Sequence, residues 1–435
     1  MSVIRPKDRD LIVQALRAGV VPRSGQQLIQ VGRVREVEVT LRDIDRIGEG
    51  GAVFRIIIGE YGAGKTFFLN LVRAIALQQK LVTAHADLNP DRRLHASGGQ
   101  ARSLFAELMK NVSTRARPDG GALGGVVEKF VAQARTDAKA QAVASESLIR
   151  SRLNPLTDMV GGYDFSEVIA QYARGFEEGN DSLVADAVRW LRGEFTTKTE
   201  ARAALGVRTI IDDDQMYDHL KLFARFVRLA GFGGLLVCLD ELVNLYKLAN
   251  RQARDSNYEQ ILRILNDVLQ GSTEGMGILL GGTPEFLLDT RRGLYSYPAL
   301  QSRLAENAFA AQAGVADYSG PVLRLTSLTQ EDFYVLLQRL RHVFAYGDPA
   351  KYLLPDEGIG AYMTHTAKRL GEAYFRTPRT TITGFLGLLA VLEQNPEKNW
   401  RELVGAVAVE ADTGAATERA VESDSDELAS FKLGA

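Results

Sequence analysis

One short segment carries the residue types that bind a triphosphate. Residues 59–66 read Gly-Glu-Tyr-Gly-Ala-Gly-Lys-Thr, which matches the pattern Gly-x-x-x-x-Gly-Lys-[Ser/Thr] in full. Glycines at these positions let backbone N–H groups close around phosphate oxygens, and the N-terminus of a following helix adds favourable partial charge. We expect Lys65 to reach the β- and γ-phosphates and the hydroxyl of Thr66 to ligate Mg²⁺. The residues expected to contact the nucleotide in this segment are Gly59, Glu60, Tyr61, Gly62, Ala63, Gly64, Lys65, Thr66 and Phe67.

The residues on either side of this segment favour the phosphate-loop interpretation. The apolar run at 53–58 predicts a strand, and residues 67–72 have the apolar character of a buried helix. A strand, a glycine-rich loop and a helix in this order form the context in which the motif holds phosphates. The alternative is a glycine-rich turn whose lysine is merely solvated, and the flanking pattern disfavours it.

A pair of carboxylates follows a second apolar strand. Asp240 and Glu241 come directly after the run 235–239, at the position where a phosphate-loop fold brings carboxylates to the nucleotide. We expect Asp240 to hold Mg²⁺ through water and Glu241 to polarise the attacking water. Charged residues at the end of a strand can also be solvated without a catalytic role, which is the alternative for both.

A strongly apolar helix is predicted at 258–269, and a third strand, predicted at 275–282, then leads into Thr283 and Pro284. If this strand neighbours the one that feeds the phosphate loop, the hydroxyl of Thr283 lies beside the γ-phosphate. Threonine before proline is also a good N-cap for a helix that begins at Pro284. Both roles for Thr283 stay open at this stage.

Two arginines are candidates for contacts with the γ-phosphate. Arg303 follows Ser302, and Arg379 follows Pro378 ahead of a Leu- and Phe-rich helix predicted at 381–393. A guanidinium offers a planar fork that suits phosphate oxygens, so either arginine could act at the transition state. Arginines are common on surfaces, and Arg291 and Arg292 lie nearby in the sequence, so position alone does not choose among them.

The order of the predicted elements indicates an α/β fold with a parallel sheet covered by helices, because strands alternate with helices around the phosphate loop. A long helical insert without strand signals interrupts it, and a helical domain follows. The expected divisions are an N-terminal helical segment at 1–48, a nucleotide-binding core at 49–320 with the insert at about 98–214, a helical lid at 321–408 and an acidic tail at 409–435. The tail has the composition of a disordered segment, although 431–433 could be a short docking element.

The composition excludes several classes of protein. The formal net charge is -2, so any contact with DNA must rest on a local basic patch. The single cysteine, Cys238, lies in an apolar run and rules out an internal disulfide framework. The five histidines lack metal-ligand spacing, and no apolar stretch is long enough to span a bilayer, so we expect a cytoplasmic protein without a membrane partner.

Taken in order, these motifs resemble the AAA+ ATPases, and the initiator and clamp-loader branch most. The resemblance covers about 30–90 and 230–395. It implies a base-binding box at Val31, Gly32 and Arg33, Walker A and Walker B motifs, sensor 1 at Thr283, an arginine finger at Arg303 and sensor 2 at Arg379. It also implies ATP and Mg²⁺ as cofactors, a homo-oligomer and a helical lid after the sheet.

The N-terminal third resembles a narrower group, the BrxD-like ATP-binding proteins of bacterial BREX phage-defence systems. The resemblance is carried by residues 15–22, by Val31 to Arg33 and by 59–68. It implies a role in antiviral defence, with DNA and a helicase or another defence protein as candidate partners. Two features depart from the AAA+ pattern: the expected lid is followed by the acidic tail, where initiators of this branch usually continue into a winged-helix DNA reader, and the insert at 98–214 has no counterpart.

Three functions are consistent with these residues. The first is an oligomeric ATPase that remodels DNA or a DNA-bound partner in phage defence. The second is a low-turnover ATP-dependent switch or scaffold that presents the insert to a partner such as a helicase. The third is a small-molecule kinase, which the Asp240–Glu241 pair and the C-terminal helical domain disfavour.

Overall fold

The computed structural model describes residues 4–22, 24–370 and 378–406. The chain divides into two compact units. The sheet unit comprises residues 34–58 and 68–324. Among the described residues, the helical unit comprises 4–22, 24–33, 59–67, 325–370 and 378–406, so that it contains the phosphate-loop segment. Each unit has a hydrophobic core of its own.

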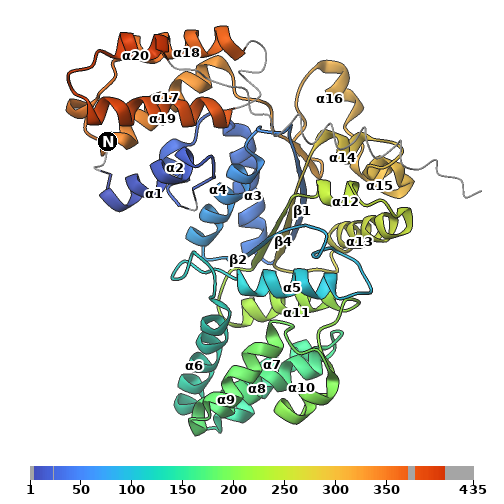
Figure 1. Ribbon diagram of the computed structural model, residues 1–435. Coiled ribbons are helices and arrows are strands. Elements are labelled where there is room, and N and C mark those ends of the chain that lie inside the picture. The colour runs from blue at the N-terminus through green and yellow to red at the C-terminus, as the bar shows by residue number, and fades with distance from the viewer. Residues whose placement is uncertain (1–3, 23, 371–377, 407–435) are drawn as a thin grey trace, which may run out of the picture. The chain divides into compact units, whose positions relative to one another are not determined.

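A five-stranded parallel sheet forms the centre of the sheet unit, in the order β2-β3-β4-β1-β5 (Figure 1). The strands are β1 (Ala52–Ile58), β2 (Val82–Asp87), β3 (Leu235–Asp240), β4 (Met276–Gly282) and β5 (Val322–Arg324). Every residue of β3 and β4 is buried, which explains why these segments are continuous apolar runs rather than alternating ones. The fold is therefore α/β with a parallel sheet covered by helices, as the sequence predicted.

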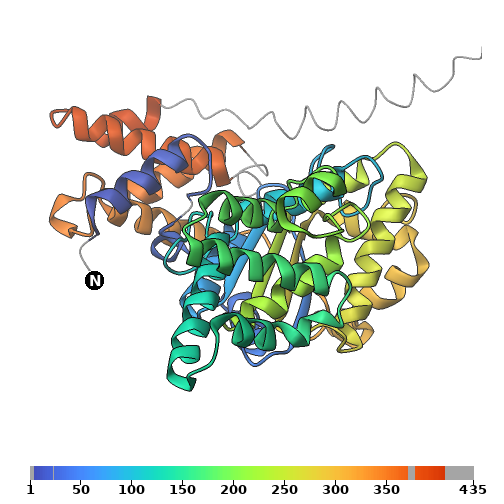
Figure 2. The same cartoon turned by 90° about the horizontal axis from the view of Figure 1, so that it is seen from below.

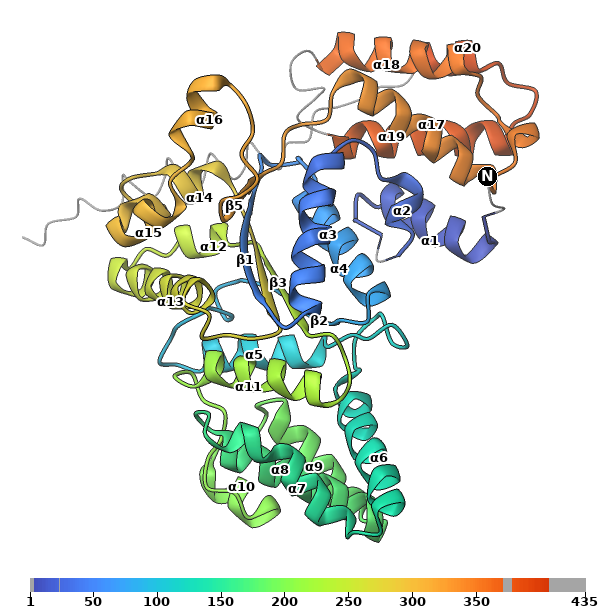
Figure 3. The same cartoon turned by 180° about the vertical axis from the view of Figure 1, so that it is seen from behind.

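Helices cover both faces of this sheet. α3 (Val34–Gly48) contacts β1 and β4, and Figures 1 and 3 show it together with α4 (Lys65–Gln78) on one side of the sheet. The same two views show α12 (Val243–Tyr246) and α13 (Arg251–Leu269) on the other side. Three short helices precede β5, namely α14 (Pro284–Leu288), α15 (Pro298–Leu304) and α16 (Ala308–Ala313).

The expected insert is helical among the described residues. Its helices are α5 (Gln100–Lys110), α6 (Leu123–Gln141), α7 (Ser145–Thr157), α8 (Gly162–Glu178), α9 (Asp181–Leu191) and α10 (Lys198–Leu205), and α11 (Met216–Leu229) returns the chain to β3. Figure 2 shows these helices in front of the sheet. Edge-to-face ring pairs join Phe226 of α11 to Phe130 of α6 and to Phe165 of α8, with ring centroids 5.1 and 5.5 Å apart. The insert thus shares one continuous core with the sheet.

Two elements differ from the expectations. β5 was missed, because three residues are too few to show a period, and the strand is defined only by its pairing with Ile56 to Ile58 of β1. The helix expected at 258–269 begins at Arg251 instead. Its first turns are polar, and Asn250 caps them by accepting a hydrogen bond from the N–H of Ala253 at 3.1 Å.

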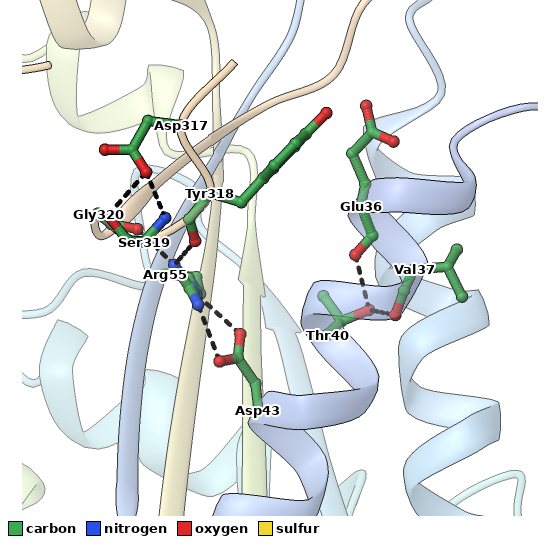
Figure 4. A network of polar contacts seen from close by, with 9 residues as sticks. All are labelled: Glu36, Val37, Thr40, Asp43, Arg55, Asp317, Tyr318, Ser319 and Gly320. Atoms are coloured by element: carbon green, nitrogen blue, oxygen red, sulfur yellow. Dashed lines mark hydrogen bonds and ion pairs between the residues drawn. The ribbon is translucent and has the colours of Figure 1, made fainter. Parts of the chain in front are cut away.

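A buried polar network ties α3 to β1 and to the segment before β5 (Figure 4). The guanidinium of Arg55 pairs with both oxygens of Asp43, at 2.7 and 2.9 Å, and the two side chains are only 12% and 13% exposed. The remaining Nη1 of Arg55 donates to the carbonyl of Tyr318 at 3.1 Å and to that of Gly320. Arg55 is the one polar residue of β1, and this network satisfies its charge.

Replacing Arg55 by leucine is expected to lower the free energy of unfolding by about 3 kcal/mol, because the Asp43 carboxylate would stay buried without its partner. Urea denaturation followed by circular dichroism measures the loss. Arg35→Ala is the matched control, since the side chain of Arg35 is 76% exposed and its ion pair with Glu38 lies at the surface. Equal losses in the two variants would show that the network contributes no more than a surface pair.

The helical unit packs its own helices around a separate apolar core. They are α1 (Pro6–Arg17), α2 (Gln26–Ile29), α17 (Gln330–Phe344), α18 (Asp356–Leu370), α19 (Pro378–Gln394) and α20 (Trp400–Ala406). α1 packs on α19, and the hydroxyl of Thr383 donates to the carbonyl of Leu16 at 3.1 Å. Residues near both ends of the sequence therefore build this unit together. The predicted acidic tail at 409–435 lies outside the described residues.

Candidate nucleotide site

The phosphate loop has the backbone conformation that its glycines permit. Gly62 and Gly64 have φ values of 79° and 77°, in the left-handed region that side chains with a Cβ rarely adopt. The ammonium of Lys65 donates to the carbonyls of Gly59 and Glu60, at 2.8 and 3.1 Å, so the lysine lies across its own loop. α4 begins at Lys65, which makes the loop continuous with a helix N-terminus. These features suit an anion held by backbone N–H groups.

The predicted base-binding box contacts this loop within the helical unit. Arg33 has a φ of 58°, and its guanidinium donates to the carbonyl of Ala63 and, at 3.4 Å, to that of Thr326. Gly32 has a φ of 60°, and a Cβ there would lie 2.9 Å from a carboxylate oxygen of Asp332. The structure therefore brings 31–33 to the phosphate loop, although the two segments lie about thirty residues apart in the sequence.

The sheet brings the carboxyl ends of three strands together. β1, from which the phosphate loop leaves, pairs with β4, and β4 pairs with β3. Ile58 is level with Gly282, and Leu239 with Leu280, so all three strands end at the same edge. Two strand spacings separate Ile58 from Asp240, which is about 10 Å. The carboxyl edge of a parallel sheet is where ligands of this fold class bind.

Asp240 is the last residue of β3, and its carboxylate is buried against β4. It accepts a hydrogen bond from the N–H of Glu241 at 2.9 Å. A Cβ at position 281 would collide with this carboxylate, so the neighbouring strand needs glycine there. The glycine leaves space for the carboxylate at the sheet edge, and sequence analysis gave Gly281 no such role.

Glu241 has a φ of 60°, which is unusual for a residue with a side chain. Its carbonyl accepts hydrogen bonds from the N–H of Asn244 at 3.0 Å and from the side-chain amide of Asn244 at 3.2 Å. That amide also donates to the carbonyl of Leu88 at 2.8 Å. The surrounding hydrogen bonds thus hold Glu241 in a conformation that costs energy, as is typical of functional positions. Its side chain is exposed.

Asp87 is a further carboxylate at this edge that sequence analysis did not single out. It ends β2 and is level with Asp240 in the parallel pairing of β2 with β3. Partial desolvation raises the pKa of Asp87 above its ordinary value, and the negative charge of Asp240 raises it further. Two adjacent carboxylates repel each other, and a cation bound between them would relieve that repulsion. Sequence patterns cannot show this pairing, because they do not give the order of strands.

Thr283 lies directly after β4, the strand next to β1, so the condition set for its role near the γ-phosphate is met. Its hydroxyl also accepts a hydrogen bond from the N–H of Phe286 at 3.3 Å. Thr283 is therefore the N-cap of α14, as one of the two predictions stated. The contact with a phosphate stays a prediction.

The two candidate arginines belong to different units. Arg303 is exposed near the end of α15 in the sheet unit, and its Nη1 donates to the carbonyl of Ala299 at 2.9 Å. Arg379 is exposed in the first turn of α19 in the helical unit. A Cβ at Gly19 would lie 3.1 Å from the Cδ of Arg379, so the arginine stem passes along the turn after α1. The catalytic roles of both arginines stay predictions.

A parallel sheet with a phosphate loop after β1 and carboxylates after β3 defines a phosphate-loop nucleotide-binding protein of AAA+ type. A family model supports a narrower statement. The model of the BREX system ATP-binding protein BrxC/D matches residues 4–408, and the chain belongs to this family. It is thus an ATP-binding protein of a BREX phage-defence system. No curated protein matches the sequence.

The family match covers nearly the whole described chain and confirms the resemblance to BrxD-like proteins. None of the helices in the described part of the chain combines the length and the apolar character that crossing a membrane requires. The same described residues contain no group of three or more His, Cys, Asp or Glu side chains placed to hold a metal ion.

Proposed function

We propose that this chain hydrolyses ATP with the help of Mg²⁺ and uses the change of nucleotide state to remodel DNA or a partner protein during phage defence in the cytoplasm. The backbone N–H groups of the phosphate loop and Lys65 bind the triphosphate. Thr66 would supply one oxygen to Mg²⁺, and Asp240 would hold the ion through water. Mg²⁺ keeps most of its water ligands in such sites, so it needs few protein oxygens. When bound, the ion neutralises charge that develops on the phosphates.

One observation carries the proposal: β1, β4 and β3 are consecutive in the sheet and end at the same edge. The phosphate loop, Thr283 and the Asp240–Glu241 pair each follow one of these strands. Glu241, held by the hydrogen bonds around it, is the group that accepts a proton from the attacking water. Arg303 acts on the nucleotide of a neighbouring copy, since it is exposed at the end of a short helix.

Lys65→Ala is expected to weaken ATP binding at least about 10-fold, because one charge-assisted contact with the phosphates contributes about 1.5–3 kcal/mol. Isothermal titration with ATP and Mg²⁺ measures this change. Lys139→Ala is the control, since Lys139 is exposed on α6 and its loss leaves the phosphate loop intact. Unchanged ATP affinity in Lys65→Ala would refute the assignment of this loop as the triphosphate site.

A low-turnover switch is the second candidate function. The exposed position of Arg303 favours this function when the chain is monomeric. A finger that acts on another copy leaves the isolated chain able to bind ATP but slow to hydrolyse it. The switch is tested by measuring how strongly a partner helicase binds Glu241→Gln in the presence of ATP and how strongly it binds Lys65→Ala. The first variant is expected to hold ATP without hydrolysing it, and the second is expected to bind ATP weakly. If both variants bind the partner equally, nucleotide state does not control recruitment and the switch is excluded.

A further inference from the structure

The sheet unit contains a pocket of about 380 Å³ away from the nucleotide edge. It lies between the loop that follows α4, the turn before α6 and the segment that leads into β3. The pocket is lined by four cationic side chains, Lys80, Arg115, Arg117 and Lys129, and by no carboxylate. The apolar part of its wall includes Leu81 and Phe232. This concentration of positive charge is notable in a chain whose net charge is -2.

The four cations are not neutralised by acidic partners. Within the described ranges, none of them forms an ion pair with Asp or Glu. The ammonium of Lys129 donates to the carbonyl of Gly231 at 3.1 Å and lies 3.8 Å from the ring centre of Phe232. Desolvation lowers the pKa of Lys129, and the positive charge of Lys80 lowers it further. Like charges therefore face each other across the pocket, which a bound anion would relieve.

The backbone holds these side chains in fixed positions. Ser113 pairs with Thr83 on the outer edge of β2 through two hydrogen bonds of 3.0 and 2.7 Å. Thr114 and Arg117 then close a four-residue turn with hydrogen bonds of 3.1 and 3.0 Å, so that the two arginines of the turn are presented from an anchored hairpin. Lys80 is fixed by a left-handed backbone at the end of α4, with a φ of 63°.

α6 contributes one face of its first turns to the same pocket. Ala122, Gly125 and Lys129 follow a helical spacing, and the residues at 122 and 125 that line the pocket are small. No side chain caps this helix start. The partial positive charge of the N-terminus adds to the field of the four cations. The pocket thus combines four cationic side chains with the partial positive charge of a helix N-terminus.

We propose that this pocket binds the phosphate backbone of DNA. The inference deepens the proposed function, because it assigns the DNA to a particular surface of the sheet unit. The pocket lies where β2 and β3 begin, and the carboxylates of the nucleotide site lie where the same strands end. Six residues of extended strand separate the two edges, which is about 20 Å. DNA bound here leaves the nucleotide edge accessible.

Charge density favours DNA over an acidic protein segment. Duplex DNA carries one negative charge per about 1.7 Å of helix axis, so several phosphates can reach four cations at once. An extended acidic peptide carries at most one charge per about 3.3 Å. Arginine forks match phosphate oxygens in two-point contacts, and both arginines of the turn are exposed. Contacts with phosphate oxygens carry no sequence information, so binding without sequence preference is expected.

The test compares two doubly substituted full-length chains. Arg115→Gln with Arg117→Gln removes two charges from the pocket, and Lys139→Gln with Lys198→Gln removes two exposed charges elsewhere in the insert. Fluorescence anisotropy with a labelled duplex of arbitrary sequence measures affinity over a range of salt concentrations. The pocket variant is expected to bind about 10-fold or more weakly, and the slope of log K against log salt is expected to fall by about 2. The control variant is expected to bind like the wild type.

Three results would overturn the proposal: equal losses in the two variants, no detectable binding of DNA by the wild type, or displacement of DNA by an equal charge concentration of polyglutamate. ATP binding, measured in the same samples, keeps this test separate from the proposed function. The pocket variant is expected to bind ATP normally. One outcome separates the two proposals. If the wild type does not hydrolyse ATP, and the pocket variant loses DNA binding while the control variant keeps it, the proposed ATPase activity is wrong and the assignment of the pocket to DNA stands.

Discussion

Glu241→Gln is expected to hydrolyse ATP about 10²- to 10⁴-fold more slowly than the wild type while it binds ATP with similar affinity. The amide keeps the size of the side chain but cannot accept a proton from the attacking water. The backbone at this position, with its φ of 60°, is held by the hydrogen bonds of Asn244 and does not depend on the carboxylate. Phosphate release at saturating ATP, together with titration of a fluorescent ATP analogue, measures the two properties separately.

Glu178→Gln is the matched control for this prediction, because Glu178 is an exposed carboxylate on α8 whose partner is Arg174. Its turnover is expected to equal that of the wild type. Normal turnover in Glu241→Gln would remove Glu241 from the role of general base. Asp87 would then be the next carboxylate to test, since it is level with Asp240 in the sheet and its pKa is raised.

The nucleotide motifs were predictable because their signals are local. The phosphate loop needs glycines at fixed spacings for its left-handed backbone, and the structure has Gly62 and Gly64 in that conformation. The strand that ends at Asp240 is buried on both faces, and its residues 235–239 therefore appear as an unbroken apolar run. Fold class and strand positions followed from such runs and from the helices between them.

Contacts between distant segments were not predictable from the same patterns. Nothing in the sequence shows that β2 pairs with β3, and the proximity of Asp87 to Asp240 depends on that pairing. The collision that fixes glycine at position 281 also depends on strand order. β5 was missed because its three residues acquire their structure only through β1. Long-range packing decides which strands become neighbours, and the spacing of apolar residues along the sequence does not reveal it.

The pocket lined by Lys80, Arg115, Arg117 and Lys129 was also not predictable from sequence patterns. Lys80 and Arg115 are separated by thirty-four intervening residues in the sequence, and Lys129 follows on α6. None of them belongs to a run of basic residues, so charge patterning gave no signal. The bridge between Thr83 and Ser113 brings the turn to β2 and creates the cluster. The overall charge suggested only that a DNA contact would need a local patch.

Arg303→Ala is expected to bind ATP normally and to lose about a thousandfold or more in turnover, the contribution of an arginine finger at the transition state. Arg303 is exposed, and the Nη1 of its guanidinium donates a hydrogen bond to the carbonyl of Ala299 in its own short helix. A guanidinium placed in this way is accessible to the nucleotide of a neighbouring copy. Phosphate release at several protein concentrations measures the effect, with Arg174→Ala as the control.

Mixing two inactive variants tests whether the finger acts between copies. Lys65→Ala keeps Arg303 but binds ATP weakly, and Arg303→Ala binds ATP but lacks the finger. In a mixed oligomer, a Lys65→Ala chain supplies its arginine to the nucleotide of an Arg303→Ala neighbour, so turnover is expected to recover partly. Normal hydrolysis by Arg303→Ala alone would refute the finger assignment and direct attention to Arg291 and Arg292. Loss of turnover without recovery in the mixture would mean that Arg303 acts within its own chain, and hydrolysis would then not require an oligomer.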